Sequence, residues 1–184
     1  MIKIFTIICY LLLFNFSIKA ENTGVETGFK IPRYVSLKSD DVNLRLGSGI
    51  KYPLVLKYKQ KNLPVEIINE YEVWREVKDI NGYQGWIHKN LLQGDRFGII
   101  YKSKNSGIKI FNKPNGKKIA EIGKRNIVNI KVCLNYWCKI NFKQTSGWVE
   151  KKYLWGVYKN EKFNIPIYQN IINLLWKINY NKFF

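Results

Sequence analysis

The chain alternates apolar and polar residues in short runs, and few of these runs are long enough for a helix. In "DVNLRL", Val42, Leu44 and Leu46 recur at every second position, which is the spacing of one face of a β-strand. "LVLKY", "PVEIIN" and "EVWREVKDI" follow as further short strands separated by turn residues. The dipeptide Asn81-Gly82 between two such runs predicts a type I′ hairpin.

The same order of runs returns in the second half of the chain. Trp137 follows Trp74 by 63 positions, and Leu154 follows Leu92 by 62. A nearly constant offset indicates an internal duplication. A unit of this size buries enough apolar surface only if its sheet closes into a barrel. The predicted barrels comprise residues 35–95 and, in diverged form, residues 103–158.

The first 34 residues differ from the rest of the chain. Residues 1–20 combine the cationic Lys3 with a long uncharged apolar stretch and end on the small residue Ala20. This pattern predicts a secretory signal peptide cleaved after Ala20; a retained membrane anchor is the alternative. Residues 21–34 show no periodicity and predict a flexible tether. The expected location is the periplasm or outside the cell.

The last segment, 162–184, has a helical pattern instead. Ile167, Ile171, Leu174 and Ile178 recur at helical spacing, which predicts a short amphipathic helix. Packing on the second barrel is one role for such a helix. Docking on a membrane surface or a partner is the other.

Two cysteines lie outside the leader. Cys133 and Cys138 flank "LNYW", a four-residue hairpin loop, so the two residues are expected to be cross-strand neighbours. In an oxidising compartment this arrangement predicts a disulfide. Two reduced, buried cysteines are the alternative.

The formal charge of +18 is unevenly distributed. Residues 21–100 contain twelve Lys and Arg against ten Asp and Glu, whereas residues 101–184 contain seventeen against three. A basic half attracts polyanions, anionic lipid surfaces or carboxylate-bearing glycopeptide. Compositional bias is the alternative, and the export signal argues against a nucleic-acid partner.

Three stretches together resemble the bacterial SH3-like (SH3b) domains, in the variant found in exported proteins of alphaproteobacteria. They are "VSLKSDDVNLRLGSGIKYPLV", "NLPVEIINEYEVWREVKDINGYQGWIHKNLL" and "LWGVYKNE". The second copy departs from the pattern, since Phe111 stands where Arg45 does, and Pro114 and Gly116 replace the glycine loop.

The resemblance implies an all-β fold with two small SH3-like β-barrels in tandem outside the cytoplasm. It also implies binding rather than catalysis, commonly of cell-wall peptidoglycan or its peptide stems. The expected partner is therefore a cell-wall glycopeptide or an envelope protein. A structural or adaptor protein that docks its basic half and tail on an anionic membrane surface or a protein is the alternative.

The sequence offers little for catalysis. The single histidine, His88, has no second base or free thiol to work with, because the two cysteines are expected to be bonded. No set of histidines and carboxylates suggests a zinc site. We therefore predict no catalytic residue, no metal and no cofactor.

Aromatic residues are the predicted ligand-binding residues. Trp74 and Trp137 stand three positions before the inward Val77 and Ile140, so both tryptophans are expected to face away from the core. The tryptophans of the two Gly-Trp pairs, Trp86 and Trp148, are expected to pack inside.

Trp74 is further predicted to line a shallow aromatic groove with tyrosines from nearby loops. Tyrosine and tryptophan suit such sites because they combine apolar area with a polar edge. Alternatively, these rings have a structural role and fill space at the ends of the barrels or between the two barrels. The predicted tyrosines are Tyr52, Tyr71 and Tyr83.

Overall fold

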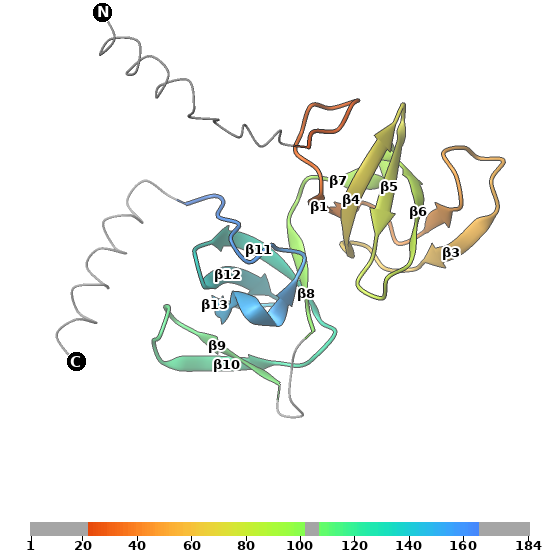
Figure 1. Ribbon diagram of the computed structural model, residues 1–184. Coiled ribbons are helices and arrows are strands. Elements are labelled where there is room, and N and C mark those ends of the chain that lie inside the picture. Colours follow the sequence, from red (N-terminus) through yellow and green to blue (C-terminus); the bar gives the residue numbers. More distant parts are fainter. Residues whose placement is uncertain (1–21, 102–106, 166–184) are drawn as a thin grey trace, which may run out of the picture.

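The computed structural model describes residues 22–101 and 107–165 and shows two β-sheets of the same design (Figure 1). Each sheet has seven antiparallel strands, ordered β3-β2-β6-β5-β4-β1-β7 and β10-β9-β13-β12-β11-β8-β14. Every strand number in the second order is seven above its counterpart in the first, and a short 3₁₀ turn precedes the last strand of both. The predicted all-β fold and the internal duplication are confirmed.

The first sheet encloses one core. Val42, Leu44, Val77 and Ile87 are fully buried inside it. Because a single sheet surrounds this cluster, the sheet curls into a small barrel. Its elements are β1 (Arg33–Leu37), β2 (Val42–Arg45), β3 (Leu54–Tyr58), β4 (Pro64–Tyr71), β5 (Trp74–Lys78), β6 (Gln84–His88), η1 (Lys89–Leu91) and β7 (Leu92–Gln93).

Strand β2 ends earlier than its alternation predicts. The register between β2 and β3 shifts between Leu44 and Arg45, and Leu46 enters the following loop, where it is 63% exposed. The expectation that Leu46 shares the buried face of Val42 and Leu44 is wrong, because a bulge breaks the two-residue period.

The hairpin between β5 and β6 also differs from the prediction. Gly82 has a φ of +90°, whereas Asn81 is outside the residues with positive φ, so the turn is not type I′. The Gly82 N–H donates to the Asp79 carbonyl (3.1 Å), and the Asp79 carboxylate accepts from the N–H groups of Asn81 and Tyr83 (2.9 Å each). Asp79 thus stabilises a three-residue connection in which a type I turn precedes a left-handed glycine.

The second sheet repeats this design around its own core. Cys133 and Cys138 are register partners on β11 and β12, are fully buried, and form a disulfide, as predicted. Its elements are β8 (Phe97–Ile100), β9 (Ile108–Phe111), β10 (Lys118–Ile122), β11 (Ile127–Cys133), β12 (Trp137–Phe142), β13 (Thr145–Glu150), η2 (Lys151–Tyr153) and β14 (Leu154–Trp155). The second barrel thus begins at Phe97 rather than at residue 103, because β8 pairs with β11 and β14.

The segment predicted as a flexible tether, 21–34, is instead folded over its described part. Thr23 forms a β-bridge with Lys30, and the Ile31 N–H donates to the carbonyl of Asn22 (2.9 Å). The loop between them is bound by the carboxylate of Glu70 from β4. Composition alone did not reveal this, because the acceptor lies about 40 residues away in the sequence.

The two barrels meet through aromatic rings. The Tyr34 ring lies 5.1 Å from the Trp155 ring and 4.7 Å from the Tyr158 ring, measured between centroids. The Tyr158 hydroxyl donates to the Glu66 carboxylate at 2.7 Å. Burial is the main cause that raises the pKa of both tyrosines, and nearby carboxylates raise it further. Both hydroxyls therefore remain protonated and able to donate at neutral pH.

The predicted signal peptide, residues 1–20, and the predicted helix within 162–184 lie outside the described residues, which reach residue 165. Within the described part of the chain, no helix has both the length and the apolar character needed to cross a membrane.

Candidate functional site

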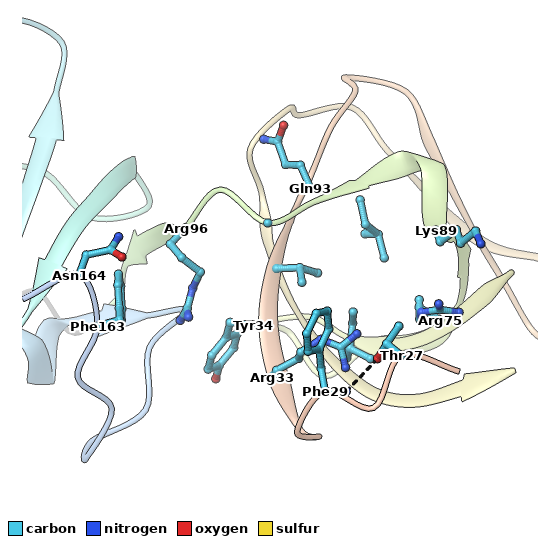
Figure 2. A pocket seen from close by; sticks show the side chains of 14 residues that line it. Thr27, Phe29, Arg33, Tyr34, Arg75, Lys89, Gln93, Arg96, Phe163 and Asn164 are labelled. Carbon is cyan, nitrogen blue, oxygen red and sulfur yellow. Dashed lines mark hydrogen bonds between the residues drawn. The ribbon is translucent and has the colours of Figure 1, made fainter. Parts of the chain in front are cut away.

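A groove of about 570 Å³ opens where the first barrel meets the segment that follows the second barrel (Figure 2). Four basic side chains line it: Arg33, Arg75, Lys89 and Arg96. In Figure 2, Arg96 lies on one side of the opening, Arg75 and Lys89 lie on the other, and Arg33 lies between them. The basic residues thus extend across the whole opening.

Aromatic rings and aliphatic side chains form much of the remaining lining. The guanidinium carbon of Arg33 lies 5.5 Å from the centre of the Phe29 ring, and that of Arg96 lies 4.7 Å from the centre of the Phe163 ring. These are cation–π distances, so each ring stabilises its arginine. The other apolar lining residues are Tyr34, Val35, Ile67 and Leu92.

The buried carboxylate of Glu70 organises one wall. Its side chain is fully buried and accepts hydrogen bonds from Arg33 Nη2 (2.6 Å), Thr27 Oγ1 (2.8 Å), and the backbone N–H groups of Thr27 (3.0 Å) and Glu26 (3.1 Å). Burial by itself raises the pKa of this carboxyl, but the hydrogen bonds from Arg33 and Thr27 outweigh burial and lower it. Glu70 is therefore ionised and fixes the N-terminal segment on the barrel.

Arg75 lies beneath the same wall. It shares the inward parity of Val77 on β5 and is only 5% exposed. Its Nε atom lies 3.4 Å from Glu70, and its Nη1 atom donates to the carbonyls of Glu72 (2.9 Å) and Trp74 (2.8 Å). Arg33 and Arg75 thus share one carboxylate, which leaves this part of the groove with excess positive charge.

The opposite wall comes from the segment after the second barrel. Arg96, between the two barrels, pairs with Glu161 through Nη1 (2.5 Å) and Nη2 (3.1 Å), and its Nη2 also donates to the Gly156 carbonyl (2.9 Å). Phe163 exchanges two backbone hydrogen bonds with Cys133, at 3.2 and 3.3 Å. The disulfide-bonded strand therefore supports this wall directly.

A buried lysine fixes the same segment. Lys151 is 5% exposed, and its ammonium group donates to the carbonyls of Leu134, Lys159 and Glu161. Burial lowers the pKa of this lysine, an effect opposed by the charge of Glu161. The Lys151 contacts join the disulfide hairpin to the segment that carries Glu161.

A sequence model for a family described as bacterial SH3 domain matches residues 38–94 and 110–156. These two ranges fall on the two barrels. The chain belongs to the bacterial SH3 domain family. Each barrel is thus one bacterial SH3 domain, and the groove lies beside the junction of the two domains.

Two solved structures are similar to part of this chain, each at 14% identity: NlpC2 and NlpC1 from Trichomonas vaginalis. The match to NlpC2 covers 74% of this chain and 52% of that protein, with a TM-score of 0.31. The match to NlpC1 covers 72% and 48%, with a TM-score of 0.30. The chain therefore spans about half the length of either structure, and similarity at this level carries no inference about activity. No curated protein matches the sequence.

The structure of the two SH3 domains does not bring the four predicted aromatic residues of the first domain into one groove. Tyr71 pairs with Trp74 at one end of β5, whereas Tyr83 follows Asp79 beyond the other end. Tyr52 lies over Gly47 in the loop between β2 and β3. All three tyrosines are about half exposed, but they lie on separate segments and none lines the groove of Figure 2.

Trp74 faces away from Val77, as its parity predicts, but it is not open to a ligand. Its side chain is 8% exposed, and its ring meets the His88 ring edge-on at 5.5 Å. Trp137 in the second domain is half-buried and makes an edge contact with Phe111 at 5.4 Å. Neighbouring rings on the outer sheet surface cover both tryptophans.

The tryptophans of the two Gly-Trp pairs belong to neither core cluster, contrary to the prediction, although Trp148 is only 6% exposed. The inward position belongs to the glycine: a β-carbon on Gly85 would lie 2.5 Å from the Arg45 carbonyl oxygen, and one on Gly147 would lie 2.8 Å from that of Phe111. Trp86 and Trp148, one residue later, therefore face outward. The repeated glycine is needed where one strand closes tightly against the next.

The groove residues were absent from the sequence prediction. One signal was available: Arg75 stands two residues before Val77, and a charged residue at an inward position indicates a buried ion pair. The remaining groove residues come from four separate segments, so only the fold brings them together. Within residues 22–101 and 107–165, no three His, Cys, Asp or Glu side chains gather as a metal site.

Proposed function

We propose that the chain is a non-enzymatic, exported binding module for peptidoglycan or another peptide of the cell envelope. The observation that carries this proposal is the groove between the two SH3 domains, where four cations meet aromatic and aliphatic walls. Ligand sites in proteins are typically concave, largely apolar and provided with a few fixed polar groups. An ionised carboxylate on an envelope peptide matches the excess positive charge.

The rigidity of the groove supports the same proposal. Glu70 and Lys151 hold the two walls through buried hydrogen bonds, and Arg33, Arg75 and Arg96 are each bonded to protein acceptors before a ligand arrives. Preorganisation lowers the entropic cost of binding. A preformed groove of this kind suits the binding of a carboxylate-bearing peptide, and this role needs no catalytic residue.

Co-sedimentation of the full chain with isolated sacculi tests this proposal. Lys89 is exposed at the rim, and the described part of the chain offers it no ion pair, so Lys89→Glu reverses one groove charge without breaking a contact. We expect this variant to bind about tenfold more weakly, as for a lost charge contact with a ligand. Lys51→Glu is the matched control, because Lys51 is exposed on a loop outside the groove. Absent sedimentation, or equal binding by both variants, would contradict the proposal.

A second function is an adaptor that docks on an anionic membrane surface. Residues 107–165 contain thirteen Lys and Arg against three Asp and Glu. Each of these acids already has an ion pair, so most of the basic residues keep their charge uncompensated. The three pairs are Lys118–Glu121, Lys152–Glu150 and Arg96–Glu161.

Liposome flotation separates this second function from the first. Binding to vesicles with anionic lipid should weaken as salt rises, because salt screens exposed charges over about 10 Å at 0.1 M. It should also be lost on deletion of residues 166–184, which keeps the groove residue Phe163. Salt-independent flotation, or none, would exclude membrane docking.

A further inference from the structure

The groove beside the domain junction is a composite site that neither SH3 domain contains alone. Arg33 and Arg75 belong to the first domain, Arg96 lies between the domains, and Phe163 follows the second. The hydrogen bond between Tyr158 and Glu66 holds the two domains together near the groove. A ligand in the groove would therefore touch both halves of the molecule.

The charges in the groove are not balanced by the protein. Two carboxylates, Glu70 and Glu161, pair with the three lining arginines, and Lys89 has no acid partner in the described ranges. Two further acids are near but do not line the groove: Asp95, which is exposed beside Arg96 in sequence, and Glu66, which accepts from the Tyr158 hydroxyl. The local excess of two positive charges favours an anionic ligand.

Two guanidinium groups also retain unused hydrogen-bonding capacity. Among the described residues, Nη1 of Arg33 and Nε of Arg96 are buried without an acceptor. Buried donors without partners are rare in folded proteins and costly. A planar carboxylate is the acceptor that best matches the guanidinium fork. The rings of Phe29 and Phe163 lie beside these two guanidinium groups.

Part of the lining between the basic residues is apolar. Val35, Ile67 and Leu92 line the groove and offer no polar side-chain atom, whereas Thr27, Gln93 and Asn164 add polar groups to the lining. A ligand that fills this space gains from burying a hydrocarbon group next to its carboxylate. Its volume of about 570 Å³ suits a few amino acid residues rather than a large chain.

We propose that this groove holds the free C-terminal carboxylate of a short peptide whose last side chain is small and apolar. The inference rests on the proposed function and specifies the group that is recognised. The carboxylate lies against Arg33, in the middle of the opening, where Lys89 and Arg96 attract it from either side (Figure 2). The terminal side chain packs on the aliphatic lining. The first SH3 domain and the segment that follows the second domain contribute to this recognition together.

The test is an NMR titration of the full chain with N-acetyl-trialanine, either as the free acid or as the C-terminal amide. We expect the acid to shift groove resonances and to bind at least about tenfold more tightly than the amide, as for one lost charge contact. Lys89→Glu should weaken binding of the acid by about tenfold, and Lys51→Glu by less than about twofold. Inorganic phosphate in place of the peptide should compete weakly, because it lacks the hydrocarbon group.

A second variant tests the same site with a smaller risk of misfolding. The double change Arg96→Gln with Glu161→Gln removes the cation and its ion-pair partner together, while the buried Lys151 keeps its three carbonyl acceptors, and it should weaken binding of the acid. Equal binding of acid and amide, or no binding of either, would overturn the carboxylate proposal even if sacculi still sediment with the protein. Binding of the acid without sedimentation of sacculi would instead overturn the proposed envelope function and leave the carboxylate site standing.

Discussion

Replacing Glu70 by glutamine removes one negative charge from inside the first SH3 domain and nearly preserves the shape of the side chain. The carboxylate accepts from four donors, which belong to Arg33, Thr27 and Glu26. A glutamine offers one oxygen and one NH₂ group. In either orientation, the NH₂ group faces donors that previously met an oxygen.

The loss of folding stability follows from the number of donors that a glutamine leaves without an acceptor. If the amide oxygen faces Arg33, the backbone N–H groups of Glu26 and Thr27 lose their acceptor. If the amide oxygen faces these N–H groups instead, Arg33 loses its acceptor. Each lost hydrogen bond to a charged group costs roughly 1.5–3 kcal/mol, so Glu70→Gln should lower the free energy of unfolding by about 3 kcal/mol. The loss of unfolding free energy is limited because residues 22–30 can detach from the barrel, and water can then hydrate their backbone N–H groups.

Equilibrium urea unfolding followed by tryptophan fluorescence measures this change. With a urea dependence of roughly 1.5 kcal/mol/M, the midpoint should fall by about 2 M. Hydrogen exchange should increase first in residues 22–30 and β4. Glu76→Gln is the matched control, because Glu76 lies on the sheet surface and, within the described ranges, accepts a side-chain hydrogen bond only from Gln84 (2.7 Å). A loss below about 0.5 kcal/mol in Glu70→Gln would refute the assigned role of this carboxylate.

The pH dependence provides an independent check. The fold lowers the pKa of Glu70 below its ordinary value of 4.5, so the ionised carboxylate adds stability above that value. This contribution is lost as the pH falls through the lower, folded-state pKa. The stability difference between the parent chain and Glu70→Gln should therefore shrink as the solution becomes acidic. A difference that stays constant from neutral to acidic pH would contradict this linkage.

Three further changes have defined outcomes. Gly85→Ala should cost about 2–3 kcal/mol in thermal unfolding, because a β-carbon there meets the neighbouring strand, whereas Gly94→Ala meets nothing within 4 Å and serves as its control. Changing Cys133 and Cys138 together to alanine should cost about 2 kcal/mol, and in the parent chain neither should react with a thiol reagent unless a reductant is present. Tyr158→Phe should lose about 1 kcal/mol and raise hydrogen exchange at the domain junction, and unchanged exchange there would contradict the contact.

Much of the fold was predictable because it depends on short-range patterns. Two-residue alternation determined the strands, and the 62–63-residue offset determined the duplication. The disulfide between Cys133 and Cys138 followed from the hairpin spacing together with the predicted export signal. Such features need only the residues within one strand or one turn, so a single sequence contains enough information.

The wrong burial predictions concern positions where a single residue alters the two-residue alternation of a strand. The bulge after Leu44 moved Leu46 into solvent, and the inward positions of Gly85 and Gly147 turned the following tryptophans outward. Neither effect is visible in composition, because a bulge depends on how two strands pair. Trp74 followed its predicted face, but its exposure depended on His88 from another strand.

The sequence by itself determined that this chain forms two small all-β domains of one design, since strand periodicity and turn residues act locally. Only the tertiary structure decided where a ligand could bind. Arg33 comes from β1 and Arg75 from β5 of the first domain. Arg96 comes from the connection between the two domains, and Phe163 comes from the segment after the second domain. Residues so far apart in sequence come together only when both barrels have folded and Glu70 and Lys151 have fixed the flanking segments.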